Sequence, residues 1–201
     1  MPVDEATRFE QLHDHYKDTF SYIQSSETRR NRLFLTTLGL SCLLVLRALS
    51  PDVTGQAIAA VLTKRFDLPM INITVFGSAL WIVLLYTIVR YFQAAASIER
   101  CYPYLHSLED LLSIEYTGKA FTREGKAYLD DYPRFSKWVT FLYTILFPVL
   151  LLLAVGISIG LDLCREGSSI GPFFNSAVGI MIEVSVVLYL QLVHEQHKKQ
   201  K

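Results

Sequence analysis

Four long apolar runs alternate with polar segments along this chain, at residues 33–49, 71–92, 138–160 and 173–193. Each run approaches the roughly 20 residues that an α-helix needs to cross about 30 Å of hydrocarbon. A short loop separates the two runs of each pair, and a longer polar and aromatic stretch separates the pairs. The pattern predicts an all-α integral membrane protein with four transmembrane helices arranged as two hairpins.

The same pattern divides the chain into five parts. They are a cytoplasmic N-terminal amphipathic helix, a first transmembrane hairpin, a cytoplasmic helical segment, a second transmembrane hairpin and a basic cytoplasmic tail, at residues 1–32, 33–93, 94–136, 137–194 and 195–201. With fewer than about 50 residues, the middle segment would bury too little surface to fold alone. We therefore expect it to pack on the N-terminal helix or on neighbouring subunits.

Orientation follows from the uneven placement of lysine and arginine. Of the 19 such residues, all but four lie in the two terminal segments and around the middle segment. Because the cytoplasmic side carries the excess of positive charge, these segments are predicted to be cytoplasmic, in a multi-pass protein of a bacterial inner membrane. The N-terminus has no signal-peptide pattern, so we expect it to be retained. Cys42 is then in the membrane, Cys101 in the cytoplasm and Cys164 outside, which disfavours disulfides within the chain.

Apolar residues recur at spacings of three and four near the N-terminus, at Phe9, Leu12, Tyr16, Phe20 and Ile23. This spacing predicts a helix with one apolar stripe. Such a stripe packs on the protein's own middle segment, or it lies in the headgroup layer or docks a partner. Acidic residues on the same helix make anionic lipid the weaker choice.

Capping and breaking residues predict further helix boundaries. Thr54 is expected to cap a short helix in the first outer loop. The second span is expected to continue as a helix into the middle segment as far as Gly118, because glycine tolerates the geometry of a helix end. After it, residues 122–129 can form one short helix, with Asp131 and Pro133 opening the third span.

Proline and glycine mark the third and fourth spans. Pro148 removes the usual donor to the Thr144 carbonyl near the centre of the third span, which predicts a hinge. Gly156 and Gly160 form a small-xxx-small pair towards its outer end, and Gly179 lies on the fourth span. We expect these glycines to let the two helices pack closely, with self-association through the same glycines as the alternative.

Three polar residues are predicted to lie within the membrane: Glu183, Arg47 and Gln191. Arg47 lies near the outer end of the first span, where snorkelling would accommodate its charge. Glu183 lies about 15 Å from the inner end of the fourth span at about 1.5 Å per residue, so it needs a partner or a proton. We hypothesise that Glu183 pairs with Arg47, or stays protonated and gates a path between subunits; a hydrogen bond used only for assembly is the alternative.

Sequence signatures of enzyme chemistry are few. There is no phosphate-binding glycine loop and no His-Glu-x-x-His motif. His13, His15, His194 and His197 are all predicted on the cytoplasmic side, where a shared metal site is weighed against solvated histidines, and solvated histidines are favoured. We therefore expect no enzymatic activity, no cofactor, no metal site and no nucleic-acid partner.

The layout resembles, in architecture only, small bacterial membrane proteins that have two hairpins and a short cytoplasmic section. These include sensors and effectors that act with a soluble partner. The leading interpretation is a non-enzymatic, oligomeric membrane sensor or membrane-perturbing effector that signals through its cytoplasmic helices. The alternative is a small channel or ion-coupled transporter that uses Glu183. The expected partners are the lipid bilayer, further copies of the chain and a cytoplasmic protein.

Overall fold

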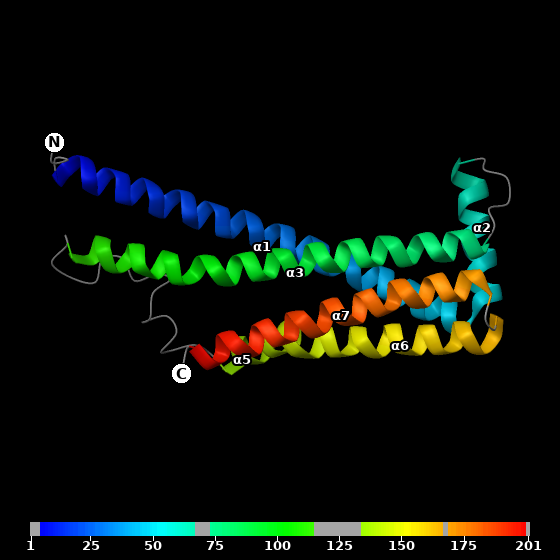
Figure 1. Ribbon diagram of the computed structural model, residues 1–201. Coiled ribbons are helices and arrows are strands. Elements are labelled where there is room, and N and C mark those ends of the chain that lie inside the picture. Colours follow the sequence, from blue (N-terminus) through cyan, green and yellow to red (C-terminus); the bar gives the residue numbers. More distant parts are fainter. Residues whose placement is uncertain (1–4, 67–72, 115–133, 167–168, 200–201) are drawn as a thin grey trace. The chain divides into compact units, whose positions relative to one another are not determined.

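The computed structural model describes residues 5–66, 73–114, 134–166 and 169–199, which are almost entirely helical (Figure 1). This confirms the predicted all-α class. A π-helical turn joins two of the helices into one irregular helix. In chain order the elements are α1 (Glu5–Leu49), α2 (Pro51–Phe66), α3 (Ile73–Ile114), α5 (Arg134–Phe141), the π-helical turn η1 (Leu142–Leu146), α6 (Phe147–Glu166) and α7 (Ile170–Lys199).

Within the described residues, four helices are long and apolar enough to cross a membrane, as predicted. Their apolar stretches lie within Thr7–Leu49, Val75–Ile114, Trp138–Arg165 and Ile170–Glu195. Much of each stretch is exposed in the single chain. A spanning helix has such a surface because lipid or further protein covers it in the membrane. The pairing of the spans as hairpins and the sides of the membrane stay predictions.

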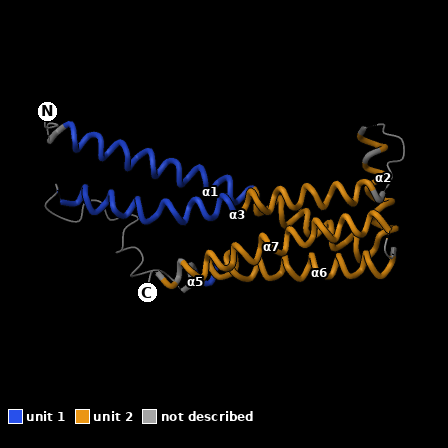
Figure 2. The backbone as a smooth tube through the Cα atoms, in the orientation of Figure 1, with its two compact units in different colours: residues 1–32, 92–139 blue, residues 33–91, 140–201 orange. Residues whose placement is uncertain are grey.

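The chain forms two compact units (Figure 2). Unit 1 contains residues 1–32 and 92–139, and unit 2 contains residues 33–91 and 140–201. The helices α1 and α3 each have one part in unit 1 and the other part in unit 2. Each unit is therefore built from segments far apart in the sequence.

In unit 1, the beginning of α1 packs on the end of α3. Ile23 lies in a small buried core with Ile98 and Leu105, and Tyr16 and Phe20 pack beside it. These three α1 residues belong to the apolar stripe predicted from their spacing. Of the two alternatives for that stripe, the structure shows packing on the protein's own later helix.

Tyrosine hydroxyls connect the same two helices. The Tyr16 hydroxyl donates to Glu109 (3.3 Å), and the Tyr22 hydroxyl is hydrogen-bonded to Ser97 (2.9 Å). The Tyr102 hydroxyl of α3 donates to Glu27 of α1 (3.3 Å). Because each bond joins residues 75 or more positions apart, the three bonds fix the register of the two helices, which the apolar stripe alone does not specify.

In unit 2, the remaining parts of α1 and α3 pack with α6 and α7. Aromatic rings meet at one end, where Phe34 of α1 contacts Tyr143 and Phe147 and lies beside Tyr91 of α3. The interior beyond these rings is apolar, and Trp81 is fully buried. Its other large buried side chains include Leu44, Leu84, Ile88, Val155, Ile182 and Val186.

One predicted helix boundary differs from the structure, and several others lie outside the described residues. Thr54 is not a helix cap, because α2 begins at Pro51 and the Thr54 hydroxyl instead donates to the Leu46 carbonyl of α1 (3.2 Å). Proline suits the first turn of a helix, whose N–H groups have no helical acceptor. The second span does continue as a helix as far as Ile114. The predictions for Gly118, residues 122–129, Asp131 and Pro133 lie outside the described residues.

Candidate functional site

A buried ion pair joins α1 and α6 in unit 2. Arg47 Nη1 lies 3.4 Å from Asp162 Oδ2, and only 8% and 9% of the two side chains are exposed. Arg47 is two residues from the end of α1, and Asp162 is four residues from the end of α6. Two charges buried together depend on each other, so loss of one leaves the other uncompensated.

Asn175 and Ser78 extend the ion pair to the other two helices. Asn175 Nδ2 donates to Asp162 Oδ2 (3.4 Å), and Ser78 Oγ donates to Asn175 Oδ1 (3.0 Å). We call Arg47, Asp162, Asn175 and Ser78 the polar cluster. Because α1, α3, α6 and α7 supply one residue each, the cluster ties the four helices together near one end of unit 2.

Gly77 makes room for the arginine of the polar cluster. A Cβ at this position would lie 2.5 Å from Arg47 Cζ and 2.8 Å from Arg47 Nη2. These distances are shorter than real van der Waals contacts, so any side chain at Gly77 would displace the guanidinium. The position of Arg47 is therefore set by α3 as well as by Asp162.

A second arginine of α6 holds the end of α1. Arg165 Nη1 donates to the Ala48 carbonyl, and Arg165 Nη2 donates to the Leu49 carbonyl (3.3 Å). The last carbonyls of a helix lack intrahelical donors, and a cation there interacts favourably with the helix dipole. Asp162 and Arg165 thus attach the end of α1 to the end of α6.

The polar cluster corrects two interpretations of Arg47. Snorkelling is wrong, because the side chain is turned into the bundle and the residue is 7% exposed. The carboxylate paired with it belongs to Asp162, not to Glu183. Asp162 is not among the predicted intramembrane polar residues because the third apolar run stops at residue 160. Its position just beyond the outer end of that run, at about the depth of Arg47, is the signal that could have identified it as the partner of Arg47.

Glu183 lies on the side of α7 that faces α6. A Cβ at Gly156 would lie 3.5 Å from Glu183 Oε1, and the carboxylate makes no hydrogen bond or ion pair with another described residue. A charge near the bilayer centre costs on the order of 3 kcal/mol. Its need for a proton or a partner stays a prediction. Gln191, two turns further along α7, is exposed.

The glycines predicted to pack α6 on α7 differ in their surroundings. A Cβ at Gly179 would lie 2.5 Å from Ile159 Cδ1 and 3.2 Å from Trp81 Cζ3, so α7 approaches both neighbours closely there. At Gly160, by contrast, no heavy atom lies within 4 Å of the Cβ position. No other described helix therefore packs on Gly160, and the alternative given for these glycines, self-association, stays a prediction.

A π-helical turn precedes Pro148. The turn η1 covers Leu142–Leu146 and so includes Thr144, whose carbonyl would be the acceptor for the N–H that proline lacks. Helices commonly bend at prolines and at π-helical turns. None of the η1 residues is buried. The hinge at Pro148 stays a prediction, and the irregular turn gives it a structural basis.

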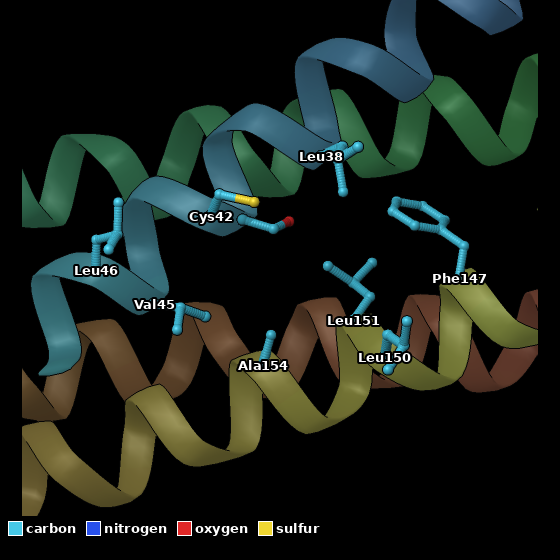
Figure 3. Close-up of a pocket in the computed structure, with 9 residues that line it drawn as sticks. Leu38, Cys42, Val45, Leu46, Phe147, Leu150, Leu151 and Ala154 are labelled. Carbon is cyan, nitrogen blue, oxygen red and sulfur yellow. The ribbon is translucent and has the colours of Figure 1, made fainter.

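An apolar pocket of about 480 Å³ lies between α1 and α6 (Figure 3). Side chains of the two helices border it from opposite sides. The Ser41 hydroxyl donates its proton to the Thr37 carbonyl (2.7 Å), and every other lining side chain is apolar or a thiol. The pocket is therefore suited to a hydrocarbon group. Its lining residues are Leu38, Ser41, Cys42, Val45, Leu46, Phe147, Leu150, Leu151 and Ala154.

The described residues offer no cluster of metal ligands. Among them no group of three His, Cys, Asp or Glu side chains could hold a metal. Residues 156–160 spell the Gly-x-Ser-x-Gly pattern of hydrolases, which requires a strand-to-helix turn. Ser158 instead lies inside α6, is buried and donates to the Ala154 carbonyl (2.7 Å). Comparison with known families, curated proteins and solved structures finds no match.

Proposed function

We propose that this protein is a non-enzymatic, oligomeric membrane sensor or effector, which responds to the bilayer through unit 2 and signals through unit 1 to a soluble partner. The observation that carries the proposal is the continuity of α1 and α3. Each is one unbroken helix with a part in each unit. Because a helix moves as a stiff body, a shift of its apolar part is transmitted to its polar part.

The pocket between α1 and α6 supports a response to the bilayer. Two of its lining residues, Leu46 and Leu150, are 55% and 53% exposed. In a spanning helix, exposed apolar side chains of this kind contact lipid. The polar cluster and Arg165 attach α1 to α6 at the end of α1. Lipid packing against the pocket can therefore change the spacing of two helices that are fixed at one end.

Exposed apolar residues on α3 support a soluble partner. Tyr104, Leu111 and Ile114 are 49%, 42% and 77% exposed. Their spacing of seven and three residues places them on one face of the helix. An exposed apolar face of this kind fits a protein surface that buries it.

The response to the bilayer is tested by measuring distances between spin labels in unit 1. Cysteines introduced at Gln24 and Arg100 of a cysteine-free protein place both labels on exposed residues of α1 and α3. We expect the distance distribution to shift between short-chain and long-chain phosphatidylcholine bilayers. Labels at Lys17 and Gln24 are the matched control, because one helix fixes their separation. A distribution that stays the same in every lipid contradicts the proposal.

A channel or ion-coupled transporter is the second candidate, and it is favoured by the carboxylate of Glu183, which has no ion-pair partner among the described residues. Ion flux into liposomes that contain the purified protein tests this function directly. Flux that exceeds the protein-free control and disappears in Glu183→Gln would favour transport. Flux at the level of the control, together with a shifted distance in unit 1, would favour sensing.

A further inference from the structure

The pocket between α1 and α6 (Figure 3) lies between two contacts that join the same helices. At one end the rings of Phe34 and Phe147 meet, with 4.7 Å between their centroids. At the other end Arg47 is paired with Asp162. The two contacts follow the same order in both helices, so α1 and α6 run in the same direction along the pocket. The pocket is therefore a defined feature of the folded bundle.

The pocket has the shape and chemistry of a slot for one hydrocarbon chain. Its α1 wall runs from Leu38 to Leu46, which is about 12 Å along the helix at about 1.5 Å per residue. Water is a poor occupant, because a bound water needs polar partners and Ser41 is the only hydroxyl among the lining side chains. Leu46 is 55% exposed in a helix that can span a membrane. The tail of a membrane lipid can therefore enter the pocket from the side.

A cation lies at the Leu46 end of the pocket. Arg165 is exposed, and its guanidinium donates to the carbonyls of Ala48 and Leu49. Leu49 follows Leu46 on the same exposed face of α1, about 4.5 Å further along the helix at about 1.5 Å per residue. The two bonds engage two of the five N–H groups of the guanidinium. The other N–H groups have no acceptor among the described residues, so they are available to an anion.

A phospholipid matches both parts of this arrangement. Its phosphate oxygens accept hydrogen bonds from a guanidinium, whose planar fork suits phosphate geometry. Asp162 precedes Arg165 by about one turn of α6, but it is buried and paired with Arg47, so the Arg165 charge is not neutralised by it. A free phosphate ion would leave the pocket unused, and a hydrocarbon without phosphate would leave the guanidinium unused.

We infer that one phospholipid binds to each chain, with a tail in the pocket between α1 and α6 and its phosphate on Arg165. This inference deepens the proposed function and rests on it in one respect, which is that unit 2 contacts the bilayer. The lipid is a bound ligand with its own stoichiometry and chemical preference, in addition to the general packing of the bilayer against unit 2. Because its tail lies between α1 and α6, occupancy affects the spacing of these helices.

The first test examines the phosphate contact by native mass spectrometry of the protein in mild detergent, titrated with phosphatidylglycerol. We expect one lipid per chain to bind ahead of all others. Arg165→Gln is expected to bind it about tenfold more weakly, because charge-assisted hydrogen bonds are lost. Arg65→Gln, which removes an exposed arginine of α2, is the matched control and should bind like the parent. Equal affinities for the two variants overturn the inference.

The second test examines the tail and leaves Arg165 unchanged. Ala154→Phe places a ring in the pocket and is expected to bind phosphatidylglycerol about tenfold more weakly. Leu153→Phe adds the same ring at an exposed position of α6 outside the pocket, so it is the matched control. Equal binding by these two variants overturns the tail contact. Diacylglycerol with the same tails lacks the phosphate, and the parent should bind it about tenfold more weakly than phosphatidylglycerol. Equal binding of the two lipids overturns the phosphate contact.

The third test leaves the pocket unaltered. Cys42 is an exposed native thiol that lines the pocket. In a protein that retains only this cysteine, saturating phosphatidylglycerol is expected to slow its reaction with N-ethylmaleimide about tenfold, because the tail covers the thiol. Leu35→Cys in a cysteine-free protein is the matched control, since Leu35 is a 66% exposed residue of α1 that does not line the pocket. Equal slowing at both positions would show general coating by lipid and overturn the inference.

The results also separate this inference from the proposed function. Preferential binding of one phospholipid, with no lipid-dependent change of distance in unit 1, contradicts the proposed function alone. A lipid-dependent distance change in unit 1, with no phospholipid bound ahead of the others, overturns the inference alone.

Discussion

The guanidinium of Arg47 lies over Gly77, where a Cβ would come within 2.5 Å of Arg47 Cζ. The same guanidinium is paired with Asp162. Space on α3 therefore determines whether an ion pair between α1 and α6 can form. The ion pair is therefore a joint property of α1, α3 and α6, and it can be weakened without changing any charged residue.

Gly77→Ala is expected to destabilise the protein although alanine is the better helix former. The added methyl group moves the guanidinium away from Asp162, at a cost on the order of 2 kcal/mol. Gly39→Ala, whose Cβ meets nothing within 4 Å, is the control and is expected to be neutral or slightly stabilising. Thermal unfolding in detergent measures both variants. Equal midpoints for the two variants would show that the ion pair contributes nothing.

Replacing both members of the ion pair is expected to be milder than replacing one. Asp162→Leu leaves the Arg47 guanidinium buried and unpaired, at a cost of about 3 kcal/mol. Arg47→Leu with Asp162→Leu removes both charges and should be more stable than either single variant. A double-mutant cycle on unfolding free energies measures the coupling. Losses that simply add would contradict a direct interaction between the two residues.

Hydrophobic patterning predicts the spans well and the polar contacts poorly. The apolar runs identify four spanning helices, and the N-terminal stripe through Tyr16 and Ile23 identifies a buried helix face. Which charged residues pair depends on how deep each helix lies in the bundle and how it is rotated about its axis. The spacing of residues along the chain determines neither. The sequence therefore predicts a pair of Arg47 with Glu183, whereas the structure pairs Arg47 with Asp162, which lies in α6 beyond the end of the third apolar run.

Native cysteines can test the predicted orientation. Among single-cysteine variants, the one that retains Cys164 is expected to react with a membrane-impermeant maleimide in intact cells, since this thiol is exposed at the end of α6. The variant that retains Cys101 is expected to react only after the membrane is permeabilised. Gel-shift labelling measures both. Reaction of Cys101 in intact cells would reverse the predicted sides of the membrane.

Pro148→Ala is expected to regularise the helix around η1. Alanine supplies the missing N–H, so the Thr144 carbonyl can accept a normal helical hydrogen bond. Amide hydrogen exchange within Leu142–Leu146 should then slow relative to the parent. Exchange in the first turns of α7 serves as the internal control. Unchanged exchange in η1 would mean that tertiary packing, and not the proline, produces the π-helical turn.

Filling the pocket between α1 and α6 is expected to reduce the response to the bilayer while leaving the free energy of unfolding nearly unchanged. Ala154→Phe places a ring in the pocket, whereas Leu153→Phe adds one to a 56% exposed position on the same helix that does not line the pocket. Both variants should unfold within about 2 kcal/mol of the parent if the pocket accepts the ring. Only Ala154→Phe should reduce the lipid-dependent distance change between labels at Gln24 and Arg100, because only it prevents hydrocarbon from acting between α1 and α6. A full response in Ala154→Phe would show that the bilayer acts on unit 2 elsewhere.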